Sequence, residues 1–313
     1  ACCARRSARR HSLQAAPRLP AKPVRLIAAV PAGSAPDVIA RIMADQLSAA
    51  WHQPVVVENR PGAGGIIGMD AARSAEPDGY TLVMPHATAA VVTPVTFKSA
   101  RYDIERDFRT IATVAYTPIA MVANLDAPAK TLADVIAQSR KNPDSVDLGN
   151  PGRTTSAHLA GELLNQQMGA SLFAVPFSGN GVQAVVGGDV PYYVDGVAPL
   201  LQMVRAKRVR PIAVFADQKL EGLEAFPLAT EVDPGLAVTG WFIVAAPAGT
   251  PQSVVQKVNA DVNRVLAKPE VAARFREFGT YPKPGSVAEA NAFVKSEKER
   301  YAEILRRAGI EAE

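Results

Sequence analysis

The sequence predicts an α/β protein made of two domains. The first observation is the order strand, tight turn, helix over residues 24–50, which recurs over residues 146–168. The second is that short apolar runs of strand length alternate with helical segments along most of the chain. The third is size and composition: 313 residues, 48% hydrophobic and 20% charged, suffice for two globular domains with a core in each.

The segment 24–50 begins with an apolar run and passes through a turn, residues 31–37, into a helix. The apolar side chains of this helix recur on one face, at Val38, Ile39, Ile42, Met43 and Leu47. Ser34 and Asp37 fit a capping box, and Pro36 suits the first helical turn. Free N–H groups at such a helix start favour an anionic oxygen, although an ordinary turn without a ligand fits the same residues. Asp37 is interpreted as a cap because its charge would repel an anion.

The next elements complete the first half of the chain. Residues 54–59 and 80–84 are predicted strands. Between them lies a glycine-rich turn, residues 60–68, in which Ile67 stands where a dinucleotide-binding fingerprint requires glycine. We therefore expect a close turn into a second sheet-packing helix, not a nucleotide site. The loop 85–88 follows the third strand, where open α/β sheets hold their ligands.

The chain is expected to change domain near residues 103–108. Two strands, 110–116 and 119–124, broken by Thr117 and Pro118, would cross the boundary. A second hydroxyl-rich turn, residues 151–158, then leads into a helix with Thr155 as its expected N-cap. The remaining predicted elements are helix 132–141, strands 146–150, 172–177, 190–194, 209–215 and 241–246, a helix ending at 187–188, and two closing amphipathic helices around 254–265 and 290–305.

These elements give a division of the chain into three parts. Residues 1–22 are predicted to be a disordered leader remnant, residues 23–105 with 227–313 form domain 1, and residues 106–226 form domain 2. The arginine-rich first part carries more than the whole net charge of +4, so the domains are nearly neutral, which excludes a nucleic-acid site. The two cysteines are adjacent, and no structural disulfide is expected. No apolar run is long enough to span a membrane.

Catalytic and metal-binding patterns are weak. His158 and Glu162 share a helix face and could start a metal site, but without a third ligand a satisfied surface or cap histidine is the preferred interpretation. Asp189 and Asp195 flank one strand as a carboxylate pair or, by default, as solvated strand-end acids. We expect no catalytic residues, metal or cofactor. What remains is one polar helix start in each domain, an arrangement that suits a small carboxylate held between them.

At these positions the chain resembles the Bug family, the extracytoplasmic solute-binding proteins of tripartite tricarboxylate transporters. The resemblance runs from about residue 22 to the C-terminus. Its motifs are Pro31-Ala32-Gly33 with Asp37, the segment 57–65, Pro77-Asp78-Gly79-Tyr80-Thr81-Leu82, Asp107-Phe108, His158-Leu159-Ala160-Gly161-Glu162, Val175-Pro176-Phe177, Gly187-Gly188 and residues 246–251.

The resemblance implies a two-domain periplasmic-binding-protein fold with a ligand cleft between the domains. It implies a non-enzymatic, periplasmic protein that captures a small carboxylate, such as a dicarboxylate, an amino dicarboxylate or a related organic acid, and delivers it to the membrane permease subunits of a transporter. The alternative is a receptor that signals to a sensor kinase, and an α/β enzyme acting on a carboxylate is the third reading. A monomer is expected.

The resemblance also implies a set of ligand-binding positions. They are Ala32, Gly33, Ser34, Ala35, Asp37, Ala87, Thr88, Arg153, Thr154, Thr155, Ser156 and Asp195. Ser34, Pro36, Arg153, Thr154 and Gly196 depart from the family pattern, so altered specificity is expected. Arg153 either pairs with a ligand carboxylate or points to solvent at the cleft mouth. Asp195 is a candidate to receive a ligand ammonium group.

Overall fold

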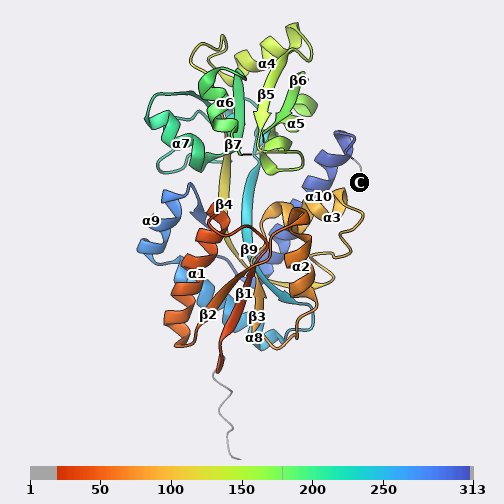
Figure 1. Ribbon diagram of the computed structural model, residues 1–313, viewed down its shortest axis with the longest axis vertical. Helices are drawn as coiled ribbons and strands as arrows, with labels where there is room; N and C mark the ends of the chain where they lie inside the picture. The colour runs from red at the N-terminus through yellow and green to blue at the C-terminus, as the bar shows by residue number, and fades with distance from the viewer. Residues whose placement is uncertain (1–19, 178, 311–313) are drawn as a thin grey trace, which may run out of the picture.

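The computed structural model describes residues 20–177 and 179–310, which form two lobes joined by long strands (Figure 1). Most of the expected leader remnant, residues 1–19, lies outside the described residues. No helix in the described part of the chain is long and apolar enough to cross a membrane.

The first part of the chain builds the lower lobe of Figure 1. Its elements are β1 (Val24–Ala28), α1 (Ala35–Trp51), β2 (Val55–Asn59), α2 (Ile66–Arg73), β3 (Thr81–Val83) and α3 (Thr93–Thr96). A short 3-10 turn, Ala63–Gly65, precedes α2, and a buried π-helical turn, Thr88–Val92, precedes α3. The strand, turn, helix order predicted for residues 24–50 is confirmed.

The middle of the chain builds the upper lobe. Its elements are β4 (Phe108–Ala123), α4 (Leu132–Lys141), β5 (Val146–Asn150), α5 (Ser156–Met168), β6 (Leu172–Pro176), α6 (Gly181–Gly187), β7 (Tyr192–Gly196), α7 (Val197–Arg205) and β8 (Arg210–Val214). Helix α4 has the bounds predicted for it. Its start is defined by a capping box between Thr131 and Asp134.

The last part of the chain returns to the lower lobe. Two 3-10 turns (Ala229–Glu231 and Pro234–Leu236) come first and still pack near β8 and α5 of the upper lobe. They are followed by β9 (Thr239–Pro247), α8 (Gln252–Leu266), α9 (Pro269–Glu277), β10 (Tyr281–Pro282) and α10 (Val287–Arg307). The two predicted closing helices are confirmed as α8 and α10, but the prediction missed α9, which lies between them. This helix buries only Val271 and Phe275, too few apolar positions to reveal a helical period.

One mixed sheet connects the lobes, in the order β2-β1-β3-β9-β4-β7-β5-β6, with β8 and β10 also paired to β4. Strands β1, β2 and β3 are parallel to one another, as are β5, β6 and β7. Strand β4 is antiparallel to β9 on one side and to β7 on the other. Figure 1 shows β4 and β9 running between the two lobes.

The prediction of two strands broken at Thr117 and Pro118 was wrong, since β4 is one continuous strand of 16 residues. Pro118 is the last residue of β4 that pairs with β9, and Ile119 is the first that pairs with β7. A proline lacks the N–H that a ladder needs. Here that missing donor falls where the strand exchanges partners, so the strand continues through it.

Helix α10 also links the lobes. Gln166 of α5 donates from Nε2 to the carbonyl oxygen of Ile304 at 3.0 Å. Tyr301, on the same helix, is almost fully buried. The lobes are therefore connected by packing of α10 on α5 as well as by the crossing strands.

Candidate ligand site

The turn before α1 is organised by Asp37, whose side chain is only 2% exposed. Its carboxylate accepts hydrogen bonds from the Gly33 backbone N–H (2.8 Å), Arg41 Nε (2.9 Å) and Asn59 Nδ2 (2.8 Å). Burial alone would raise the pKa of Asp37, but these hydrogen bonds lower it below its usual value. The charged carboxylate thus fixes the turn and faces the protein.

The capping box predicted for Ser34 and Asp37 was wrong in detail. Ser34 occupies the N-cap position, but its hydroxyl donates to the carbonyl of Pro31 at 2.7 Å and makes no cap bond. The carboxylate of Asp37 bonds to Gly33 instead. Pro36 does lie in the first helical turn, as predicted.

The turn before α5 follows the prediction more closely. Thr155 is the N-cap, and its hydroxyl oxygen accepts a hydrogen bond from the His158 backbone N–H at 3.2 Å. The same hydroxyl donates to the carbonyl of Gly152 at 2.8 Å. Thr154 has φ of +66° and donates to the carbonyl of Arg153. Two side-chain bonds therefore hold this helix start open toward the space between the lobes.

A cavity of about 460 Å³ lies between the two helix starts. It is lined by predicted positions from the lower lobe, Ala35, Ala87 and Thr88, and from the upper lobe, Thr155, Ser156 and Asp195. The other predicted positions, Ala32, Gly33, Ser34, Asp37, Arg153 and Thr154, are not among its lining residues. Arg153 is exposed at its turn.

The sequence reasoning missed the apolar and aromatic part of this wall. Trp241, Phe242, Phe278 and Ile119 line the cavity, and Trp241 is fully buried. In the sequence these residues have the pattern of ordinary core positions, so nothing distinguishes them as cavity lining. Among the residues that the structure describes, no lysine or arginine lines the cavity. A ligand anion would therefore meet helix N-terminal N–H groups in place of a cationic side chain.

Asp195 is the penultimate residue of β7 and lies at the wall of the cavity. It is half-buried, whereas Asp189 is exposed, so the expectation of two solvated strand-end acids holds only for Asp189. The Asp195 carboxylate accepts from the Gly196 N–H at 2.6 Å and from the Tyr193 hydroxyl at 3.2 Å. Burial outweighs these bonds and raises the pKa of Asp195 to about 6.

Two histidines lie near the cavity in different surroundings. His86 lines it, and desolvation lowers the pKa of His86 to about 4, so its imidazole is neutral. His158 is 6% exposed, and the preferred interpretation of a satisfied surface or cap histidine was wrong, because the ring is buried and its Nδ1 has no hydrogen-bond partner among the described residues. Its Nε2 lies 3.6 Å from Glu162 Oε1. Residues 20–177 and 179–310 contain no group of three side chains suited to a metal ion.

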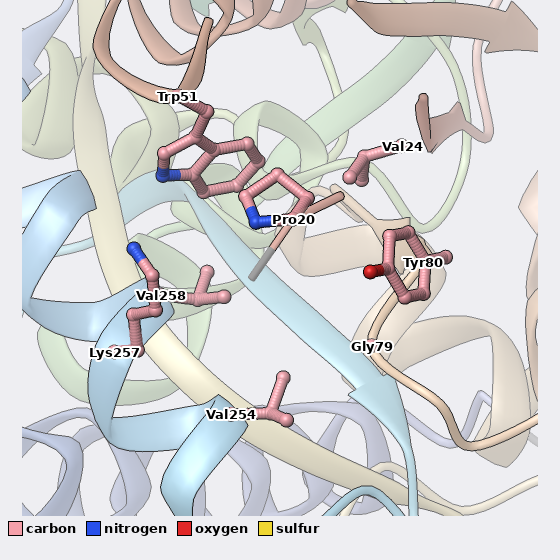
Figure 2. A pocket seen from close by; sticks show the side chains of 8 residues that line it. All are labelled: Pro20, Val24, Trp51, Gly79, Tyr80, Val254, Lys257 and Val258. Atoms are coloured by element: carbon pink, nitrogen blue, oxygen red, sulfur yellow. The ribbon is translucent and has the colours of Figure 1, made fainter. Parts of the chain in front are cut away.

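A second hollow lies at the other end of α1, beneath the described start of the chain. Figure 2 shows Pro20 next to the indole of Trp51, with Tyr80, Val24 and Lys257 around them. Its volume is about 10 Å³, roughly the space that one water needs, so it is too small for an organic ligand. The cavity between the lobes is the candidate site because the starts of α1 and α5 and predicted positions from both lobes line it.

Comparison with known proteins identifies the family. The model of the tripartite tricarboxylate transporter family receptor, TctC, matches residues 39–310. The chain belongs to this family. It is 30% identical over 294 residues to BugT of Bordetella pertussis, covering 93% of this chain and 90% of BugT, so the expected Bug resemblance is confirmed.

Solved structures agree with the TctC assignment. MatC of Rhodopseudomonas palustris with bound malate has a TM-score of 0.75 and 27% identity, covering 91% of this chain and 99% of MatC. Rpa4515 of R. palustris with adipate has a TM-score of 0.81 and 27% identity, covering 94% of this chain and 100% of Rpa4515. This TctC chain thus has the α/β periplasmic-binding-protein fold and is a solute-binding protein, not an enzyme.

Proposed function

We propose that this TctC-family chain is a periplasmic receptor that captures an organic carboxylate between its lobes and delivers it to the membrane subunits of a tripartite tricarboxylate transporter. The observation that carries the proposal is the cavity of about 460 Å³ bounded by the starts of α1 and α5. Binding of adipate and malate by related proteins supports a carboxylate ligand. Delivery to a transporter rests on the family's description.

The ligand carboxylate would bind at the start of α5. Ser156 and Ala157 line the cavity in the first turn of that helix, where no preceding turn supplies carbonyl partners for their N–H groups. The macrodipole adds attraction for a negative charge at the same place. At the start of α1, Pro36 removes one N–H, so α5 contributes more donors than α1 does.

The lobes would close on the ligand as two units. Under this proposal residues 23–105 with 227–313 move against residues 106–226. Strands β4 and β9 cross between the lobes and would bend where β4 exchanges partners at Pro118. The exposed Arg153 would then come nearer to a bound anion.

The experiment is a thermal-shift screen of purified protein that has been unfolded and refolded to remove co-purified ligand. The panel contains C4 to C6 dicarboxylates, citrate, aspartate, glutamate, and aliphatic and aromatic monocarboxylates, each with the corresponding primary amide as control. Ligand at 100 times its Kd stabilises the fold by about 2.7 kcal/mol, a shift of several degrees. Small-angle scattering with the best ligand should report a smaller radius of gyration. Equal shifts with acids and amides would contradict the proposal.

A further inference from the structure

We propose that the cavity selects carboxylates that also carry hydroxyl or amino hydrogen-bond donors on an apolar body, and that Tyr301 determines this selectivity by fixing the direction of the Ser156 hydroxyl. This inference rests on the proposed function and specifies the ligand class of the same site. It follows from an account of where the hydrogens of the lining hydroxyls go.

The first hydroxyl is Ser156, in the first turn of α5. Its Oγ lies 3.0 Å from the Tyr301 hydroxyl, which lies 2.8 Å from the carbonyl oxygen of Thr239. A carbonyl oxygen can only accept, so Tyr301 must donate to Thr239. Tyr301 then has no hydrogen left for Ser156, and Ser156 must donate to Tyr301. Burial raises the pKa of Tyr301, which keeps its hydrogen in place.

A second chain of the same kind lies at the crossing strands. Thr280 donates to the carbonyl of Phe278 at 3.1 Å. Its oxygen lies 3.2 Å from the Thr117 hydroxyl, so Thr117 supplies the hydrogen of that contact. Both threonines line the cavity. At the start of α5, Thr155 likewise donates its hydrogen to Gly152.

These bonds give the wall an excess of acceptors. Ser156, Thr117 and Thr155 have committed their hydrogens inside the protein. Ser156 and Thr117 keep their oxygen lone pairs, and Thr155 keeps one beside the bond that it accepts from the His158 N–H. The carboxyl of Asp195 adds further acceptor oxygens to the same wall. Carboxylate oxygens also only accept, so they gain nothing from these groups; their donors are the helix N–H groups, with the Thr88 hydroxyl and the neutral His86 imidazole as further donors on the wall. The acceptors are instead satisfied by donors that the ligand brings.

The rest of the wall defines the body of the ligand. Trp241, Phe242 and Phe278 line the same cavity, and Trp241 keeps its Nε1–H for Glu297 at 3.0 Å. These surfaces offer apolar contact and no additional donor. The complementary ligand is a chain of several methylene groups or an aromatic ring, with a carboxylate at one end and a hydroxyl or amino group at the other. The carboxylate meets the helix N–H groups, the body meets the aromatic wall, and the hydroxyl or amino group meets the acceptor oxygens.

The test compares ligands that differ only in the donor. Calorimetric titration of the refolded protein would use hexanoate against 6-hydroxyhexanoate, and benzoate against 4-hydroxybenzoate. We expect the hydroxylated member to bind about tenfold more tightly, the effect of one neutral hydrogen bond to an otherwise unpaired acceptor. In Ser156→Ala this preference should fall several-fold.

Tyr301→Phe tests the direction of the Ser156 hydroxyl. The change frees the hydrogen of the Ser156 hydroxyl, which can then donate to a carboxylate. Hexanoate and adipate should therefore bind this variant more tightly than they bind the wild type, and the preference for 6-hydroxyhexanoate over hexanoate should shrink. In the double variant Ser156→Ala/Tyr301→Phe the gain for hexanoate should disappear. The matched control is Tyr192→Phe, which removes another buried tyrosine hydroxyl, bonded to Gln138 at 2.6 Å in the upper lobe, and should leave the preference unchanged.

The outcomes separate the two proposals. If wild type binds hexanoate and adipate as tightly as 6-hydroxyhexanoate, the selectivity is refuted and the carboxylate function stands. If none of the acids binds, both proposals fail. Should Tyr301→Phe not fold, Ser156→Ala alone decides, because an unchanged preference in that variant overturns the assignment.

Discussion

The pKa of the Asp195 carboxyl depends on its burial at the wall of the cavity. Its pKa is raised from 3.8 to about 6 by burial. The folded chain therefore binds this proton more tightly than the unfolded chain does. By linkage, the free energy of unfolding decreases as the pH rises from about 4 to about 6, and the full cost of the buried charge remains at higher pH.

Asp195→Asn should remove this cost. The amide oxygen can still accept from the Gly196 N–H, so we expect the free energy of unfolding at pH 7.5 to rise by an amount on the order of 2 kcal/mol. The gain should fade near pH 4, where the wild-type carboxyl is already protonated. Urea unfolding at both pH values measures it, with the exposed Asp189→Asn as control. An equal change at both pH values would count against the buried charge.

At the residue scale, the sequence predicted interactions that act over a few positions. Thr155 caps α5 because its partner, His158, is three residues away. The contacts that give the cavity its character join distant residues. Ser156 meets Tyr301 across 145 positions, and Trp241 meets Glu297 across 56. No local pattern encodes such pairs, so they could not be predicted from the sequence.

At the element scale, periodicity predicted most strands and the longer helices. It failed where an element is short, as in α9, or where a local rule was offset by its surroundings, as at Pro118 in β4. A proline ends a strand only if its missing N–H was needed for pairing. That condition depends on which strands lie on each side, which the order of residues does not reveal.

The caps of α4 and α5 allow a matched test at this scale. Thr131 accepts from Asp134 N at 3.1 Å, and Thr155 accepts from His158 N at 3.2 Å. Each change to alanine should lower the free energy of unfolding by about 1 kcal/mol. Only Thr155→Ala should also weaken carboxylate binding, because it loosens the turn at the cavity. Chemical denaturation and carboxylate titration of both variants measure these effects. An equal loss of carboxylate affinity in both variants would show that the turn before α5 does not contribute to ligand binding.

At the scale of the whole molecule, the sequence predicted an α/β fold in which the polar helix starts of the two domains face each other across a cleft. What it could not supply was the shape between them. The cavity depends on how β4, β7, β9 and α5 are placed, and its aromatic wall comes from strands and a helix end whose residues have the composition of a core. The division at residues 105–106 and 226–227 stays a proposal that scattering on closure would test.

The continuity of β4 has a consequence for how the molecule melts. Its 16 residues pair with β9 in the lower lobe and with β7 and β8 in the upper one, so neither half can lose its sheet without exposing an edge of the other. Thermal denaturation should therefore be one cooperative event, with equal calorimetric and van't Hoff enthalpies. Two resolved heat-capacity peaks would contradict this. A carboxylate bound in the cavity would then protect both halves at once, including surfaces it never touches.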